Sequence, residues 1–264
     1  ALIAAVALAV VCLRRDKISL LILALCGSFI VMLTGIVIYT AKIGGFSRSQ
    51  QITLFLLPKI QQYLQYLPIS LDIQGYLAAV GRCCFPCILL LIALNYSMSS
   101  LVHRHFWSLR VLAFGAGVWL IYYYPTVFRF WVRGRWGLQQ FMGNLSLIWI
   151  IVCVLLAMLL LVHEYRNIFI PYFKKNFRYI LLSYVSMAFL YLIYGIHDPA
   201  QIYQFYGLEF LWIWRGSYTT GMMDSFTWAA LGLCSVFFVI LGSINLLRHT
   251  RVAYNEDLET VYLQ

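Results

Sequence analysis

Long apolar stretches alternate with short polar segments along the chain. Apolar runs that end at charged or polar residues occupy positions 1–13, 18–41, 74–97, 107–125, 143–162, 177–196 and 226–247. A helix needs roughly 20 apolar residues to cross the hydrocarbon core of a membrane, and all the runs but the first reach about that length. The pattern predicts an all-α polytopic membrane bundle with about seven transmembrane helices, the first run being the remainder of a longer segment.

Two further stretches are apolar but interrupted by polar residues, and we expect neither to cross the membrane. In residues 52–67 the Lys and Gln side chains fall on one helical face and the apolar side chains on the other. In residues 202–218 the apolar run is interrupted by Gln204, Glu209 and Arg215. A helix with one polar and one apolar face lies flat in the membrane interface. Residues 52–67 are therefore predicted to form an interfacial amphipathic helix on the outer surface.

The composition excludes a soluble globular protein. Hydrophobic residues make up 63% of the chain and charged residues 11%, whereas soluble domains are about one quarter charged. Aromatic residues reach 17%, as expected where Trp and Tyr anchor helices at the two membrane surfaces. We therefore expect residues 1–247 to form one transmembrane domain that contacts membrane lipids.

The Lys and Arg residues predict the orientation of the chain. They number 19 against 9 Asp and Glu, which gives a net charge of +10. They gather in short loops beside the apolar runs, which favours lipid headgroups over nucleic acid as their partner. Eleven of them would share one side of the membrane with the C-terminus and seven would lie on the other. Because basic loops stay in the cytoplasm, the C-terminus of this integral membrane protein is predicted to be cytoplasmic.

Two sets of residues raise the question of redox or metal chemistry. Residues 83–87 read Cys-Cys-Phe-Pro-Cys and contain a C-x-x-C pattern, but the other cysteines are isolated and offer no second pair for a thiol relay. Buried thiols packed around a proline kink are the favoured interpretation. The histidines stand at predicted helix ends, where two facing axial ligands for haem are not expected, and neither a metal nor a cofactor is predicted. They are His103, His105, His163, His197 and His249.

Arg82 is the clearest charge inside a predicted span. A guanidinium in the membrane interior costs about 2.5 to 3.5 kcal/mol on insertion scales unless it is paired or hydrated. One interpretation is that Arg82 snorkels or pairs with an acid merely to orient helices. The other is that it lines an outward-open cavity for a ligand with apolar and charged groups. That candidate site consists of Arg82, Asp72, Glu209, Arg215, Asp224, Trp212, Trp214 and Tyr218, with Asp72, Asp224 and Glu209 as the acids expected within reach of Arg82.

Residues 248–264 differ from the rest because they are polar and contain neither Gly nor Pro. Leu247, Tyr254, Leu258 and Val261 follow a spacing typical of a two-helix seam. We expect the last span to continue as a cytoplasmic stalk helix that pairs in a homodimer. The segment resembles the one that leads from the membrane sensor into the kinase core of multi-span bacterial sensor histidine kinases. The resemblance implies a sensor domain in a bacterial plasma membrane. The phosphoacceptor-histidine and ATP-binding motifs of the family do not occur in this sequence, so the resemblance assigns no catalytic residue to it.

Three functions are consistent with these observations. The favoured one is a membrane sensor that detects an extracellular or membrane-embedded ligand (a peptide, a lipid-like molecule or a small amphipathic molecule) and signals to a cytoplasmic kinase module. The alternative is a transporter or permease subunit for a small or amphipathic substrate. A transporter would place polar groups and broken helices at mid-membrane, whereas the runs at 18–41, 143–162 and 226–247 carry no charged residue. The third is a small redox or lipid-modifying enzyme that uses the cysteine cluster.

Overall fold

Helices account for all the regular secondary structure in the part of the chain that the structure describes. The computed structural model describes residues 17–42, 58–97, 100–132, 134–168, 171–195 and 198–200. The elements are α2 (Lys17–Lys42), α4 (Pro58–Tyr66), α5 (Leu71–Tyr96), α6 (Ser100–Phe114), α7 (Ala116–Tyr122), α8 (Pro125–Val127), a π-helical turn η1 (Phe128–Val132), α9 (Trp136–Asn167) and α10 (Pro171–Gly195). The all-α class predicted from the sequence is confirmed for these residues.

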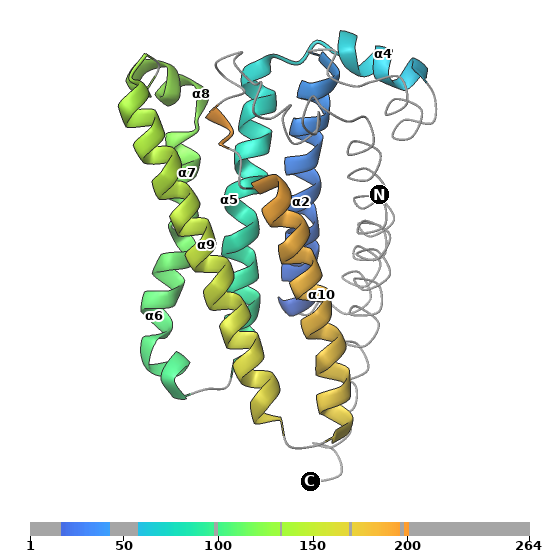
Figure 1. Ribbon diagram of the computed structural model, residues 1–264, viewed down its shortest axis with the longest axis vertical. Helices are drawn as coiled ribbons and strands as arrows, with labels where there is room; N and C mark the ends of the chain where they lie inside the picture. Colours follow the sequence, from blue (N-terminus) through green and yellow to red (C-terminus); the bar gives the residue numbers. More distant parts are fainter. Residues whose placement is uncertain are drawn as a thin grey trace, which may run out of the picture.

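The long helices run along the long axis of the molecule, and α5 is their central member (Figure 1). α5 contacts α2, α6, α7, α8 and α9, and α9 also contacts α10. α5 and α9 run away from the end that carries α4, and α7 and α10 run back toward it (Figure 1). The connections from α5 to α6 and from α9 to α10 therefore share one end of the bundle, as the alternating polar segments of the sequence predict.

Two helices of the described chain are long and apolar enough to cross a membrane, namely Asp72–Tyr96 and Trp136–Asn167. A third candidate is the pair Trp107–Tyr122 and Pro125–Val132, which together reach the required length but are bent by 60°. Shorter apolar helices lie within α2 and α10. The structure thus shows two or three helices of membrane-spanning length, and the arrangement of seven spans stays a prediction.

The predicted span at 107–125 is not a single straight helix. The chain bends before Pro125, where Tyr124 is extended with φ −62° and ψ 129°. The residue before a proline favours this conformation because the proline ring clashes with a helical backbone there. Beyond the bend lie α8 and η1, most of which falls between the apolar runs at 107–125 and 143–162. The predicted run therefore ends at the bend, whereas the short helical segment beyond it was not predicted.

α2 and α5 pack so closely that two glycines leave no room for a side chain. A Cβ atom on Gly35 would lie 2.7 Å from the backbone nitrogen of Ala78, and one on Gly81 would meet the backbone of Met32. Small residues let helix backbones approach in a membrane, where van der Waals packing drives helix association. This contact makes α2 and α5 the most closely packed pair of the described helices, and Arg82 follows directly after one of its glycines.

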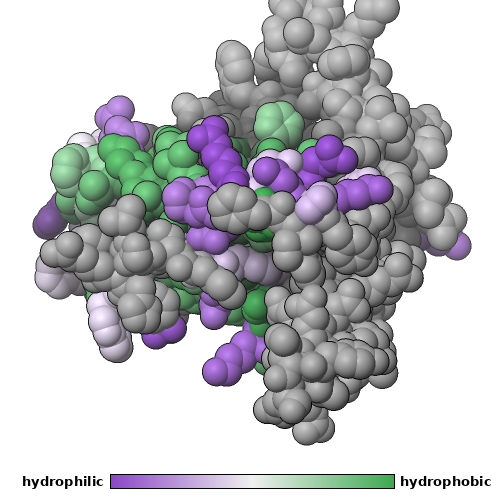
Figure 2. Space-filling model, turned by 90° about the horizontal axis from the view of Figure 1, so that it is seen from below, coloured by the Kyte–Doolittle hydropathy of each residue, from purple (hydrophilic) through white to green (hydrophobic). Residues whose placement is uncertain are grey.

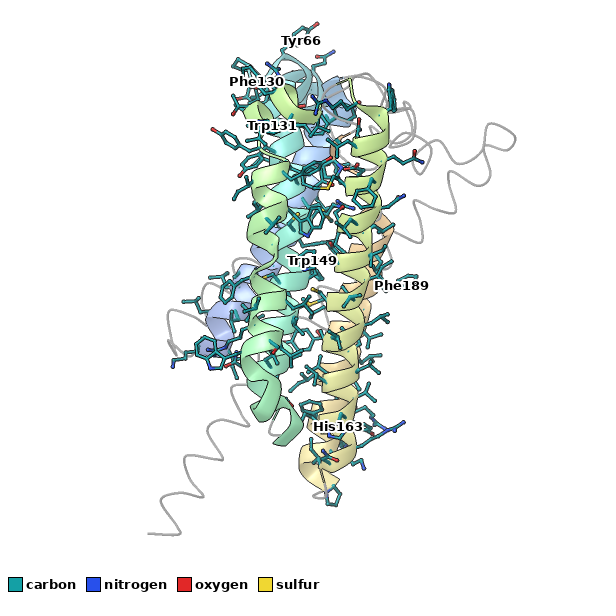
Figure 3. All side chains as sticks on the ribbon, turned by 90° about the vertical axis from the view of Figure 1, so that its left-hand side faces the viewer. Tyr66, Phe130, Trp131, Trp149, His163 and Phe189 are labelled. Carbon is teal, nitrogen blue, oxygen red and sulfur yellow. The ribbon has the colours of Figure 1, made fainter. Side chains whose placement is uncertain are left out.

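The end of the bundle that carries α4 exposes aromatic side chains. Tyr66 of α4 and Phe130 and Trp131 of η1 all lie at this end, while His163 lies at the other (Figure 3). Phe130 is 84% exposed, and α4 lies across the ends of the long helices (Figure 1). Exposed Trp and Tyr are typical of the membrane–water interface. α4 covers the second half of the stretch predicted to lie flat at the membrane surface, and its interfacial location stays a prediction.

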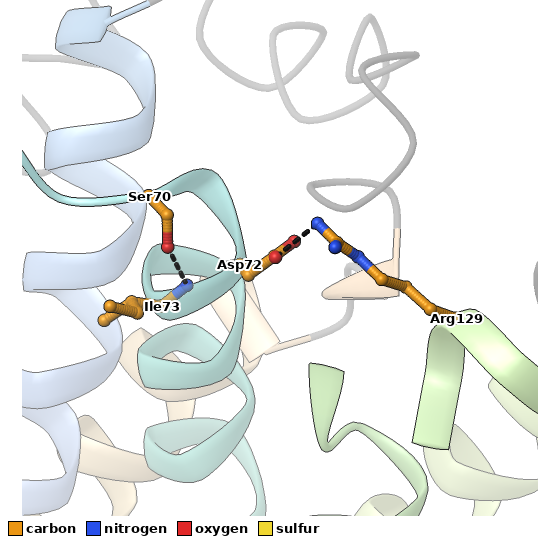
Figure 4. Close-up of polar contacts among 4 residues, drawn as sticks. All are labelled: Ser70, Asp72, Ile73 and Arg129. Atoms are coloured by element: carbon orange, nitrogen blue, oxygen red, sulfur yellow. Dashed lines mark hydrogen bonds and ion pairs between the residues drawn. The ribbon is translucent and has the colours of Figure 1, made fainter. Parts of the chain in front are cut away.

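An ion pair connects η1 to the start of α5 (Figure 4). Ser70 caps α5 by accepting a hydrogen bond from the backbone nitrogen of Ile73 at 3.4 Å. In the first turn of the helix, the Asp72 carboxylate pairs with Nη2 of Arg129. The Arg129 side chain is 55% exposed, and exposed pairs contribute only about 0 to 1 kcal/mol. The pair therefore positions η1 more than it stabilises the fold.

The opposite end of the bundle is polar. Figure 2 views the molecule from this end and shows hydrophilic residues beside the hydrophobic flank of the helices. Arg166, Lys175 and Arg178 are exposed around the connection between α9 and α10. This is the side to which the sequence analysis assigned the larger share of basic residues.

We predict that Gly81→Ala destabilises the protein by about 1 to 3 kcal/mol, the usual cost of forcing an extra methyl group into a packed contact. Gly117→Ala is the matched control, because a Cβ atom there meets nothing within 4 Å. The melting temperatures of the purified variants in detergent, followed by tryptophan fluorescence, measure the difference. If both variants melted at the wild-type temperature, the close approach of α2 and α5 would be wrong.

Candidate functional site

Arg82 is buried in the middle of the bundle, and its hydrogen bonds define the candidate site. Its side chain is only 2% exposed, and it projects from α5, the helix that contacts most of the others. A buried guanidinium is strongly unfavourable unless polar groups surround it. The groups that surround Arg82 therefore determine how the neighbouring helices are arranged.

Three hydrogen bonds join the guanidinium of Arg82 to three other parts of the bundle. Nε donates to the carbonyl oxygen of Gly195 at 2.7 Å, at the end of α10, where carbonyls have no partner within the helix. Nη1 donates to the Tyr123 hydroxyl and to Ser146 Oγ, each at 3.0 Å. Tyr123 directly follows α7 and Ser146 lies in α9. Arg82 thus connects α5 with α7, α9 and α10.

An acidic residue reaches Arg82 through a hydroxyl group. The Tyr123 hydroxyl accepts from Arg82 and donates to Oδ1 of Asp198 at 2.8 Å. Ser146 Oγ likewise accepts from Arg82 and donates to the carbonyl oxygen of Gly143 at 2.8 Å. Because each hydroxyl has one hydrogen, this pattern uses the hydrogens of both hydroxyls. The Asp198 carboxylate therefore compensates the charge of Arg82 through one intervening hydroxyl rather than by direct contact.

The main chain of Arg82 belongs to the same cluster. Pro86 lies four residues later in α5 and has no N–H, so the carbonyl of Arg82 lacks the donor that a helix normally provides. The Tyr191 hydroxyl donates to this carbonyl oxygen at 2.6 Å, and the Tyr191 ring stacks on Phe85 with 4.3 Å between ring centroids. Tyr191 thereby satisfies a backbone group that has no access to water in a membrane.

Two glycines make space for the groups around Arg82. A Cβ atom on Gly195 would lie 2.8 Å from the ring of Tyr191, and one on Gly143 would lie 2.7 Å from Oδ2 of Asp198. The backbone nitrogen of Ala200 also donates to Oδ1 of Asp198 at 3.1 Å. The Tyr191 ring and the Asp198 carboxylate therefore occupy space that a side chain at Gly195 or Gly143 would fill. We call Arg82, Tyr123, Ser146, Tyr191 and Asp198, with their glycines, the Arg82 cluster.

The structure places two of the residues predicted to line a cavity, and it does not bring them together. Arg82 is at the centre of the cluster, whereas Asp72 pairs with Arg129 at the end of α5. The other predicted residues lie outside the described part of the chain: Glu209, Arg215, Asp224, Trp212, Trp214 and Tyr218.

Sequence reasoning missed the residues that contact Arg82. Sequence reasoning also missed Asp198, which reaches Arg82 through Tyr123. Asp198 stands two residues after the predicted span at 177–196, and an acid near a span end was a signal that could have been used. Tyr123 and Tyr191 gave no such signal, because a Tyr in an apolar run is equally typical of a helix that packs on its neighbour or anchors at the membrane surface.

The described cysteines are free thiols that pack among apolar side chains. Cys83, Cys87 and Cys153 are buried, which agrees with the buried-thiol interpretation, and α5 continues through Pro86 as one helix. In the described ranges, the His, Cys, Asp and Glu side chains form no group of three or more suited to a metal ion. Glu164 is buried near the end of α9 and accepts a hydrogen bond from Ser97 at 2.9 Å.

The Arg82 cluster is an arrangement that holds opposite charges at fixed positions between helices. Polar networks in a low-dielectric interior are strong when complete, and this one includes groups from four helices and from residues 198–200. Comparison with known protein families, curated proteins and solved structures finds no match for the chain. A function must therefore be inferred from the cluster itself.

We predict that Tyr191→Phe destabilises the protein by about 1 to 3 kcal/mol, the cost of leaving a buried carbonyl unsatisfied. In a Pro86→Ala background the same change should cost less than half as much, because the alanine backbone supplies an N–H to the carbonyl of Arg82. Unfolding free energies in mixed micelles give the four values of this double-mutant cycle. Tyr63→Phe is the control, since Tyr63 is 70% exposed. An equal cost in both backgrounds would show that Tyr191 does not serve this carbonyl.

Proposed function

We propose that this chain is the membrane sensor domain of a receptor that detects an extracellular or membrane-embedded ligand and signals to a cytoplasmic kinase module. The observation that carries the proposal is the Arg82 cluster, in which one buried charge is shared among α5, α7, α9, α10 and Asp198. A ligand that replaces one of these contacts changes which helices are held together.

A shared buried charge is suited to switching between two arrangements. Packed interfaces change between discrete states rather than deforming continuously, and a ligand that prefers one state shifts the population toward it. The end of α10 is held at Arg82 through Gly195, and Asp198 follows it closely in the chain. The chain then continues toward the predicted last span at 226–247, so a displacement of Asp198 acts at the start of the segment that leads to the stalk.

A transporter is the alternative function. Transporters use broken helices at the middle of the membrane, and the 60° bend between Trp107–Tyr122 and Pro125–Val132 is a break of this general kind. The bend, however, lies near the end of the bundle that carries α4 (Figure 1), next to the exposed Phe130 and Trp131. This position favours an interfacial segment over a substrate gate, and so favours the sensor.

The resemblance of residues 248–264 to the segment before the kinase core in bacterial sensor histidine kinases supports a dimeric receptor in a bacterial plasma membrane. These residues and the span at 226–247 lie outside the described part of the chain. In the proposal they form one continuous helix that pairs with its copy in a homodimer. The apolar seam of this helix pair is short and interrupted by Arg251. The pairing is therefore weak by itself and responds to small displacements of the transmembrane helices.

We predict that single cysteines introduced across residues 247–264 crosslink unevenly in membranes. Disulfide bridges should be most frequent at Leu247, Tyr254, Leu258 and Val261, because these positions follow the spacing of a two-helix seam. Non-reducing gels of membranes from cells that produce each variant of the full-length protein give the profile. A flat profile, or no dimer at any position, would contradict a signalling stalk.

We also predict the orientation of the bundle. A cysteine introduced at Gln62 of α4 should react with an impermeant maleimide added to intact cells, whereas one at Lys175 of α10 should react only after lysis. Both positions are exposed and lie toward opposite ends of the bundle, and the basic residues favour the cytoplasm for the second. The unsubstituted chain controls for labelling of the native cysteines. The opposite pattern would invert the proposed topology.

A further inference from the structure

Two of the five N–H donors of Arg82 have no acceptor among the residues that the structure describes. Nε and Nη1 use three donors on Gly195, Tyr123 and Ser146. Nη2 is buried and makes no hydrogen bond to any described residue. A guanidinium has five donors and cannot accept, and a buried donor without a partner is costly. A ligand oxygen within hydrogen-bond distance of Nη2 would therefore accept from two N–H groups that are already buried away from water.

A second buried group without a partner lies beside the cluster. The Tyr122 hydroxyl makes no hydrogen bond within the described residues. The ring centroid of Tyr122 is 4.8 Å from that of Tyr123, whose hydroxyl donates to Asp198. Buried polar side chains in folded proteins nearly always have partners. One exception within the Arg82 cluster and a second beside it indicate a place for a polar group of a bound molecule.

We propose that the Arg82 cluster binds a ligand that brings an anionic oxygen, from a carboxylate or a phosphate group, to Nη2 of Arg82; this inference rests on the receptor function proposed above. The three acceptors that Arg82 now contacts are neutral oxygens, and the Asp198 carboxylate hydrogen-bonds to Tyr123 rather than to Arg82. Within the described chain, the guanidinium thus has no direct anionic partner. Hydrogen bonds between ionised groups are about twice as strong as neutral ones, so an anion is preferred over an alcohol, and a cation is repelled.

The surroundings of the cluster indicate that the rest of the ligand is apolar. Phe85 stacks on Tyr191, and Trp119 and Phe128 lie 6.2 and 6.1 Å from Tyr122 between ring centroids. Aromatic side chains of this kind line sites in which a few polar groups fix the orientation of an apolar molecule. A fatty-acid-like carboxylate and the phosphate of a membrane phospholipid both have the required chemistry, and the experiment separates them.

The test measures the melting temperature of the full chain in nanodiscs, followed by tryptophan fluorescence. In phosphatidylcholine nanodiscs, octanoate should raise the melting temperature in a saturable manner, whereas octanol, which lacks the charge, should not. In a second arm, nanodiscs that contain phosphatidylglycerol are compared with phosphatidylcholine alone. Saturable stabilisation by octanoate identifies a free carboxylate as the ligand class. Stabilisation only by phosphatidylglycerol identifies an anionic phospholipid, whose phosphate charge is not balanced by a choline as it is in phosphatidylcholine.

Variants connect either effect to the cluster. Tyr122→Phe removes a hydroxyl that has no partner in the described chain, so the fold should tolerate it, and it should weaken anion binding about tenfold, the loss expected for one hydrogen bond to a charged group. Arg82→Gln should abolish binding. Tyr124→Phe and Arg135→Gln alter exposed side chains nearby in the sequence and should leave binding unchanged.

The outcomes distinguish this inference from the proposed function. Equal effects of octanoate and octanol, or equal loss of binding in Tyr122→Phe and Tyr124→Phe, would overturn the anion site. If the anion binds as expected but the stalk shows a flat crosslinking profile, the ligand site stands and the sensor function fails. If the stalk crosslinks with the expected periodicity but no anion binds, only the ligand class is wrong.

Discussion

A guanidinium buried within a helix bundle requires polar partners, and the arrangement of four helices around Arg82 follows from this requirement. The unpaired charge would be strongly unfavourable at this depth, and its acceptors come from Gly195, Tyr123 and Ser146. These belong to different parts of the chain, so the helices that carry them must converge on α5. Asp198 then lies where the Tyr123 hydroxyl can donate its hydrogen to a carboxylate, which places a compensating charge without a direct ion pair.

The contact between α5 and α10 shows how one residue creates the need for another. Pro86 deprives the carbonyl of Arg82 of its helical donor, and Tyr191 supplies the missing hydrogen. Tyr191 and Gly195 are four residues apart and therefore share one face of α10. That face presents a hydroxyl to the backbone of Arg82 and a carbonyl to its side chain. The two contacts depend on each other, because the glycine leaves space for the Tyr191 ring.

The sequence predicts the apolar helices and the importance of Arg82, but not the partners of Arg82. Apolar runs give the approximate positions of α5, α9 and α10 because lipid-facing and core-facing residues are both apolar. Asp72 was the nearest acid in the sequence, yet in the structure it faces Arg129 at the end of α5. Which acid reaches a buried charge depends on helix rotation and on which helices are neighbours, and neither is encoded in spacing along one helix. The break before Pro125 was foreseeable from the proline alone.

The two kinds of packing in the bundle assign different roles to its parts. α2 and α5 meet through their backbones at Gly35 and Gly81, a contact in which the Arg82 side chain makes no hydrogen bond. The end of α10, by contrast, is held to α5 by polar contacts with Arg82 and by one aromatic stack. A molecule that competes for Arg82 therefore acts on α10 and Asp198 rather than on α2. The fold thus combines a rigid pair of helices with a neighbour whose position depends on the state of one charged residue.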